Sequence, residues 1–162
     1  MDLRRLRAGE WIAAAGGVAL LVSLWLPWYS GPPGGEASLN GWRSLAASDV
    51  LLALIAASAV ALLLITAAQS VPAVPIALSV FVTFAGFAGV VLVLLRALGV
   101  PEGADSRDWG LWLALAATVG IAVGALLAMR DERLSPEGAY TDLTGRPTTA
   151  PAEIETFPAP RP

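Results

Sequence analysis

The amino-acid sequence predicts an all-α integral membrane protein, an antiparallel four-helix bundle followed by a disordered C-terminal tail. Hydrophobic residues make up 56% of the 162 positions, and the mean hydropathy is +0.68. Soluble domains contain about 45–50% apolar residues. Residues 50 to 95 and 109 to 129 also lack any charged side chain. Such long uncharged stretches favour helices that cross a membrane over the core of a soluble domain.

Four segments are long enough to span a bilayer, at about 11 to 28, 49 to 68, 75 to 97 and 109 to 129. A spanning helix needs about 20 apolar residues, since each adds about 1.5 Å across a hydrocarbon core of about 30 Å. The first segment follows Arg4, Arg5 and Arg7, which is also how a cleaved signal peptide begins. The run is long, however, and residues 27 to 29 (Pro-Trp-Tyr) suit cleavage poorly. We therefore expect an uncleaved first helix.

Proline and glycine predict where the central helices end. Pro72 and Pro75 interrupt the long apolar stretch, and a proline disfavours helix in the residue before it, so we expect a tight hairpin between two helices. Gly99 suits a left-handed helix cap, and Pro101 prevents the third helix from continuing.

Ionisable residues are expected at helix ends and not inside the bilayer. Asp105 or Ser106 can cap the fourth helix, and Asp108 faces the positive end of its dipole. Glu10, Asp49 and Arg96 are also predicted at helix ends. Transporters and ion pathways usually carry an ionisable residue within the membrane. No ionisable residue is predicted within the membrane here, so a transport role is the weaker alternative.

Arginine counts predict the orientation. Seven arginines lie on one side, at the N-terminus, at the end of the fourth helix and in the tail, and three lie on the other side, at Arg43, Arg96 and Arg107. Basic residues near helix ends stay in the cytoplasm. We therefore expect a multi-pass protein of the cytoplasmic cell membrane with both termini cytoplasmic.

Composition divides the chain into a transmembrane domain, residues 1–130, and a disordered cytoplasmic tail, residues 131–162. The tail is rich in proline, acids and threonine and has few large apolar groups. It buries too little surface to offset the entropy lost on folding.

The aromatic residues are predicted to lie at the two membrane interfaces, where amphipathic rings prefer the headgroup level. Trp25, Trp28 and Tyr29 have the spacing of one helical face at the outer end of the first helix. Trp42 follows a Gly/Pro-rich loop and is expected to bring the chain back to the surface. The whole predicted interface set is Trp11, Trp25, Trp28, Tyr29, Trp42, Trp109 and Trp112.

A ridge of small residues on the fourth helix is predicted to pack against another helix or another copy. Ala116, Gly120, Gly124 and Ala128 recur every four residues. Small residues allow the close backbone approach by which membrane helices associate. On this hypothesis, leucine at either glycine lowers stability far more than Ala122→Leu on a different face.

Several function classes are disfavoured by composition. The chain has no cysteine and no histidine, so thiolate or imidazole catalysis and metal sites built on those ligands are excluded. We predict no catalytic residues, no metal and no cofactor. A net charge of −3 also argues against nucleic acid as a partner.

The stretches LWLPWYS, NGWRSL and DVLLAL resemble a group of small actinobacterial membrane proteins with four predicted helices and no assigned function. The match covers roughly residues 15 to 60. It implies a four-helix membrane protein and carries no activity with it.

The sequence therefore favours a non-enzymatic structural or partner-binding membrane module. Its expected partners are the lipid bilayer and a membrane-protein partner or further copies of itself. The alternative is a small transporter or channel subunit, with a polar path built from residues such as Ser58, Thr66, Ser79, Thr83 and Thr118.

Overall fold

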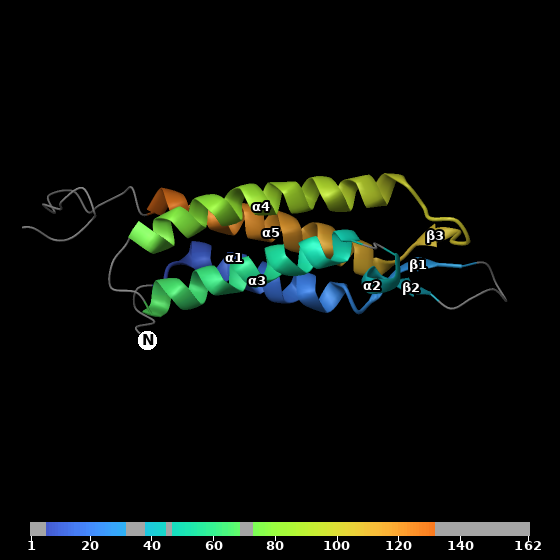
Figure 1. Cartoon of the computed structure of the whole chain (residues 1–162), viewed down its shortest axis with the longest axis horizontal. Coiled ribbons are helices and arrows are strands. Elements are labelled where there is room, and N and C mark those ends of the chain that lie inside the picture. Colours follow the sequence, from blue (N-terminus) through green and yellow to red (C-terminus); the bar gives the residue numbers. More distant parts are fainter. Residues whose placement is uncertain (1–5, 32–37, 45–46, 69–72, 132–162) are drawn as a thin grey trace, which may run out of the picture.

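The computed structural model describes residues 6–31, 38–44, 47–68 and 73–131. Within them, four long helices lie alongside one another and a small sheet covers one end (Figure 1). The long helices are α1 (Ala8–Ser23), α3 (Ala47–Ala68), α4 (Ala73–Leu98) and α5 (Trp109–Asp131). The predicted hairpin turn at 69–72 and the predicted tail, from residue 132 onward, lie outside the described residues.

Neighbouring helices run antiparallel, and each long helix packs against two others. α1 lies between α3 and α5, with its most extensive contact on α5, and α4 lies between α3 and α5. The core between them is built from aliphatic and small residues, including Leu20, Leu52, Leu62, Val82 and Ile121. The start of α1 and the end of α5 lie at one end of the helices, and the sheet lies at the other (Figure 1). We call the latter the sheet end.

Three of these helices are long and apolar enough to cross a membrane, namely α3, α4 and α5. They contain the segments predicted at 49 to 68, 75 to 97 and 109 to 129. α1 is shorter, with 16 residues, which corresponds to about 24 Å.

The prediction that the first helix continues to Trp28 is wrong, because α1 ends at Ser23. The next amides bond three residues back instead of four, from Trp25 N to Val22 O and from Leu26 N to Ser23 O, both at 3.1 Å. This tightening precedes Pro27, which has no N–H with which to continue the helix. The chain then becomes extended and forms a strand.

The described residues are mostly helical, as predicted, and a small sheet that the sequence did not predict is added at one end. The sheet has the order β2-β1-β3, from β1 (Pro27–Ser30), β2 (Leu39–Asn40) and β3 (Ser106–Arg107), and both pairings are antiparallel. A four-residue helix, α2 (Gly41–Ser44), follows β2. Asn40 begins α2, since its side-chain oxygen accepts the amide of Arg43 at 3.0 Å. We call β1, β2, β3, α2 and Asp108 together the cap.

α4 ends where glycine and proline predicted. The amide of Gly99 donates to the carbonyl of Leu95 at 3.2 Å, and a tight turn follows in which the amide of Ala104 donates to the carbonyl of Pro101. Gly103 occupies the third position of this turn with φ of +85°, a left-handed conformation that glycine adopts at little cost.

Candidate functional site

The centre of the cap is formed by Trp28 and Tyr29, which are 0% and 1% exposed. The sequence analysis placed both residues on one face at the outer end of the first helix, at headgroup level; in the structure they lie beyond the end of that helix and are buried. Because α1 ends at Ser23, the two residues fall in strand β1, where successive side chains point to opposite faces. Both are nevertheless buried, so the strand is enclosed on both faces.

Trp28 provides a hydrogen-bond donor for the last carbonyl of α1. Its indole Nε1 donates to the carbonyl of Ser23 at 2.8 Å, and the hydroxyl of Ser23 donates to the carbonyl of Leu20 at 2.6 Å. The last carbonyls of any helix lack partners within the helix, and a buried one without a partner is costly. Pro27 has no N–H to offer the Ser23 carbonyl, which instead accepts two other donors, the amide of Leu26 at 3.1 Å and the indole of Trp28.

The cap also provides hydrogen-bond donors for the last carbonyls of α4. The hydroxyl of Tyr29 donates to the carbonyl of Arg96 at 2.8 Å. The guanidinium of Arg107 donates through Nε to the carbonyl of Ala97 and through Nη2 to that of Leu98, the latter at 3.3 Å. A cation at this position also suits the negative end of the helix dipole. Burial raises the pKa of the Tyr29 phenol above its ordinary value of 10.0.

Asp108 links the cap to the start of α5. Its carboxylate accepts the hydroxyl of Ser30 at 2.6 Å and the amide of Trp109 at 2.8 Å. Its own amide donates to the carbonyl of Trp28 at 2.8 Å. The two hydrogen bonds from Ser30 and Trp109 lower the pKa of the Asp108 carboxyl. The sequence assigned this capping role to Asp105 or Ser106, but the carboxylate that accepts the first amide of α5 belongs to Asp108, which was expected only to face the helix dipole.

The remaining predicted interface aromatics lie on the surface. Trp11, Trp25, Trp109 and Trp112 are 53%, 71%, 54% and 52% exposed. Trp42 is partly buried on α2, and its ring lies 5.7 Å from that of Trp25, tilted by 58°. The indole nitrogen of Trp42 is buried and has no hydrogen-bond partner among the residues that the structure describes. The predicted set thus divides into four exposed residues, the partly buried Trp42, and two core residues of the cap, Trp28 and Tyr29.

The predicted small-residue ridge of α5 meets α1 along its inner half. A Cβ added at Gly124 would lie 2.4 Å from the amide nitrogen of Ala13, so the two backbones touch there. Ala128 is also buried, at 1% exposure. At Gly120 the nearest atom to an added Cβ is 3.9 Å away, and Ala116 is exposed. The outer half of the ridge is therefore not part of the same close contact.

The sequence reasoning did not identify the matching surface on α1. A Cβ at Gly9 would lie 2.4 Å from the amide nitrogen of Ala128, and Gly16 approaches the carbonyl of Ala117. Gly9, Ala13 and Gly17 recur every four residues, the same signal that marked α5. Gly17 faces α3 instead, where the carbonyl of Ala56 lies 2.7 Å from an added Cβ.

Ala122→Leu was the comparison substitution for the two glycines, but Ala122 itself lies against another helix. It is 2% exposed, and a Cβ added at Gly86 of α4 would lie 2.8 Å from its Cα. α5 therefore makes close backbone contact with two helices. A large residue at Ala122 has to disrupt the contact with α4.

Polar residues inside the helices bond mostly to their own backbone. Ser58, Ser79, Thr83 and Thr118 each donate to a carbonyl three or four residues earlier. The hydroxyl of Thr66 is buried and finds no partner within the described part of the chain. Hydroxyls that bond their own helix provide few free groups to line a polar path.

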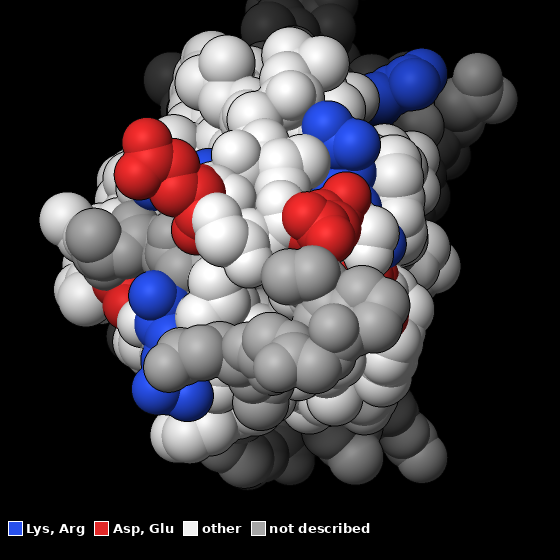
Figure 2. All heavy atoms as spheres, turned by 90° about the vertical axis from the view of Figure 1, so that its right-hand side faces the viewer, with Lys and Arg blue, Asp and Glu red and all other residues white. Residues whose placement is uncertain are grey.

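Charged residues gather at the helix ends. Glu10 and Asp49 are 3% and 7% exposed, and each carboxylate accepts a nearby amide, from Arg7 at 2.9 Å and from Val50 at 2.6 Å. At the sheet end, acidic and basic side chains are interspersed among uncharged residues (Figure 2). Within the described part of the chain, no three acidic side chains converge as metal ligands would.

Comparison with protein-family models, with curated proteins and with solved structures finds no match to this chain. Function therefore has to be inferred from the geometry. That geometry consists of an apolar lateral surface and a cap whose side chains bond the ends of α1, α4 and α5.

Proposed function

We propose that the chain is a multi-pass membrane protein in which α1, α3, α4 and α5 form a bundle. The observation that carries this proposal is the lateral surface of the described helices. Large apolar side chains are exposed on all four, for example Val22 (50%) on α1, Leu54 (62%) on α3, Phe84 (71%) on α4 and Trp112 (52%) on α5. Soluble monomers rarely expose so extensive an apolar surface, whereas lipid solvates it.

The cap supports a structural or partner-binding role over an enzymatic one. Its polar side chains bond to the ends of helices. The indole of Trp28 donates to the carbonyl of Ser23, and the hydroxyl of Tyr29 donates to the carbonyl of Arg96. Near a bilayer such internal hydrogen bonds matter more, because water is scarce. The result is a rigid platform on the outer side of the membrane, suited to contact another membrane protein.

The proposed orientation places the cap outside and both termini in the cytoplasm. It rests on the seven-to-three arginine split and on the start of α1 and the end of α5 lying at the same end (Figure 1). α1 is short for a spanning helix, and the apolar turn residues Leu24, Trp25 and Leu26 would lengthen its crossing up to the cap.

The test is a pair of reporter fusions on a chain expressed in bacterial cells. A reporter active only in the cytoplasm is fused after Arg133, and one active only outside is inserted at Gly103 in the tight turn. We expect both fusions to be active and the protein to stay in the membrane fraction after alkaline washing. Release by alkali, or the opposite reporter pattern, overturns the proposal.

The same membranes test the partner-binding role. Purification in a gentle detergent, followed by mass spectrometry, is expected to recover a stoichiometric partner or a defined oligomer. Solute or ion flux through liposomes containing only this protein would instead support the transporter alternative.

A further inference from the structure

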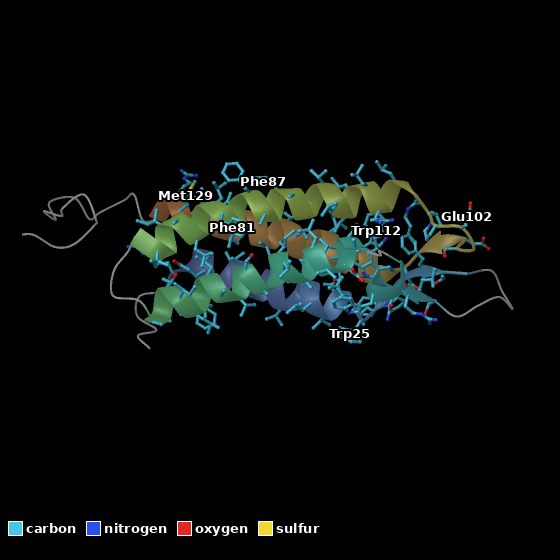
Figure 3. All side chains as sticks on the ribbon, viewed as in Figure 1. Trp25, Phe81, Phe87, Glu102, Trp112 and Met129 are labelled. Atoms are coloured by element: carbon cyan, nitrogen blue, oxygen red, sulfur yellow. The ribbon has the colours of Figure 1, made fainter. Side chains whose placement is uncertain are left out.

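The chain between α4 and the start of α5 exposes charged side chains of both signs. Glu102, Asp105 and Arg107 are all exposed. Figure 3 shows Glu102 beyond the end of α4, at the tip of the turn that leads to β3. Within the described part of the chain, the carboxylates of Glu102 and Asp105 have no bonding partner, and neither pairs with Arg107. These charges are therefore available to a ligand.

Arg107 is held in position by the end of α4. Its Nε donates to the carbonyl of Ala97, and its Nη2 donates to that of Leu98 at 3.3 Å. A guanidinium carries five N–H donors in a planar fork, so donors remain after these two bonds. Because the side chain is already fixed, it can bind a phosphate with little further loss of rotational freedom.

The carboxylates lie farther from the helices than Arg107 does. β3 runs antiparallel to β1, which leads away from the end of α1, so the chain returns through β3 toward α5 (Figure 1). The amide of Asp105 donates to the carbonyl of Ser30 at 2.9 Å, which extends the strand pairing to Asp105. Alternate residues of a strand point to the same side, about 7 Å apart. Asp105 thus lies on the same side of the strand as Arg107 and farther out.

Apolar surface adjoins Arg107 in the opposite direction. Leu98 is 78% exposed, and Leu95, almost one helical turn earlier, is 59% exposed. Since Arg107 bonds the carbonyl of Leu98, its guanidinium lies next to this surface. From the helices outward, the order is apolar surface, one cation and two carboxylates. We call Leu95, Leu98, Glu102, Asp105 and Arg107 the headgroup site.

The charges around the headgroup site disfavour a ligand with a net negative charge. At the sheet end, carboxylates and guanidiniums are present in nearly equal number and are interspersed (Figure 2). Those of the described residues are Arg43, Arg96, Arg107, Asp49, Glu102, Asp105 and Asp108. A ligand that carries both an anion and a cation complements such a surface, whereas an anionic one is repelled by Asp105 and Glu102.

We infer that the headgroup site binds an outer-leaflet phospholipid whose headgroup carries an ammonium beyond its phosphate, as in phosphatidylethanolamine. Arg107 donates to the phosphate oxygens, the carboxylates of Asp105 and Glu102 attract the ammonium, and an acyl chain lies against Leu98 and Leu95. The order of these groups in the lipid is the order of the side chains in the site. The inference rests on the proposed membrane location and orientation.

Titration of the purified full chain with single lipids tests the headgroup. The chain, in a non-ionic detergent, receives phosphatidylethanolamine or phosphatidylglycerol with the same acyl chains, and native mass spectrometry counts the bound lipid. Phosphatidylglycerol has the phosphate and lacks the ammonium. We expect phosphatidylethanolamine to bind about two- to fivefold more tightly, as befits an exposed ion pair. Equal affinities, or a preference for phosphatidylglycerol, overturn the inference.

Two arginine variants test the phosphate contact. Arg107→Gln should weaken the binding of both lipids about tenfold, because charge-assisted hydrogen bonds to the phosphate are lost. Arg43→Gln is the matched control, since Arg43 is also exposed at the sheet end but lies on α2, which follows the opposite edge strand β2. It should leave both affinities unchanged. Equal losses in the two variants contradict a specific role for Arg107.

Asp105→Asn separates headgroup recognition from stability. The Asp105 side chain has no bonding partner among the described residues, so the variant should keep the wild-type melting temperature. It should lose the preference for phosphatidylethanolamine without binding phosphatidylglycerol more weakly. A preference of unchanged size would remove Asp105 from the site and overturn the inference, even where Arg107→Gln proves unstable.

Inorganic phosphate distinguishes a lipid from a free anion. We expect it not to displace phosphatidylethanolamine at equal concentration, because it offers neither the ammonium nor the acyl chain. Displacement would assign Arg107 to a soluble phosphate and exclude the lipid. Alkaline washing of membranes measures the membrane location separately, so a failure of the proposed location is recognised independently of lipid binding.

Discussion

The indole Nε1 of Trp28 donates a 2.8 Å hydrogen bond to the carbonyl oxygen of Ser23, five residues earlier in the chain. This bond connects the first strand to the helix that precedes it. It lies at the point where Pro27 cannot extend the helix, and it fixes the direction in which the chain enters the cap.

Replacing Trp28 by phenylalanine should destabilise the protein by about 1–2 kcal/mol, since it removes a donor to a buried carbonyl and part of a buried ring. Trp112→Phe provides the control, because Trp112 is 52% exposed and its substitution should change stability by less than about 0.5 kcal/mol. Thermal melting in a mild detergent compares the two. Equal melting temperatures would show that the Trp28 hydrogen bond contributes nothing to stability.

Tyr29→Phe should loosen the end of α4. The variant loses the hydroxyl that bonds the Arg96 carbonyl, a loss of about 1 kcal/mol. Hydrogen exchange should accelerate at the amides of the last turn of α4 and stay unchanged near Val82, which is fully buried in the middle of the helix. Acceleration spread evenly along α4 would contradict a local role for Tyr29.

Gly124→Ala and Gly120→Ala should have opposite effects on stability. At Gly124 an added Cβ meets the backbone of Ala13 at 2.4 Å, so α1 and α5 must separate, at a cost of about 1–3 kcal/mol. At Gly120 the nearest atom is at 3.9 Å, and alanine should stabilise the helix by up to about 1 kcal/mol. Melting temperatures of both variants check the sign. Destabilisation of similar size at both positions would argue against the close backbone contact between α1 and α5 at Gly124.

Stability of the cap should decrease in acid because of Asp108. The folded state lowers the pKa of this carboxyl below its ordinary value of 3.8, through hydrogen bonds from Ser30 and Trp109. Its contribution is therefore present above pH 3.8 and is lost as the pH falls through the folded-state pKa. At pH 7, Asp108→Asn should have a lower melting temperature than the wild type. At pH 2 to 3, the difference between the two melting temperatures should be smaller. An unchanged difference across this range would exclude the carboxylate as its source.

The sequence by itself determined the three long apolar helices. Uncharged length is a local property, and so are the proline and glycine signals that end α4 at Leu98. Asp108 at the start of α5 and the small residues of its inner half were also recognisable, because a favourable charge at a helix start and close packing each require specific residue types at fixed positions. The surface positions of Trp25 and Trp112 follow from the same kind of local pattern.

Only the tertiary structure decided which aromatic residues are core and which are surface. An amphipathic ring suits a headgroup layer and a buried hydrogen bond equally well, so Trp25 and Trp28 are indistinguishable by type. Trp28 and Tyr29 are buried because α1 stops at Ser23 and because Ser106 and Arg107, almost 80 residues away, complete the sheet beside them. The acceptor of the Tyr29 hydroxyl, the Arg96 carbonyl, is likewise distant in the chain. Such pairings depend on how four helices bring their ends together, which no local pattern specifies.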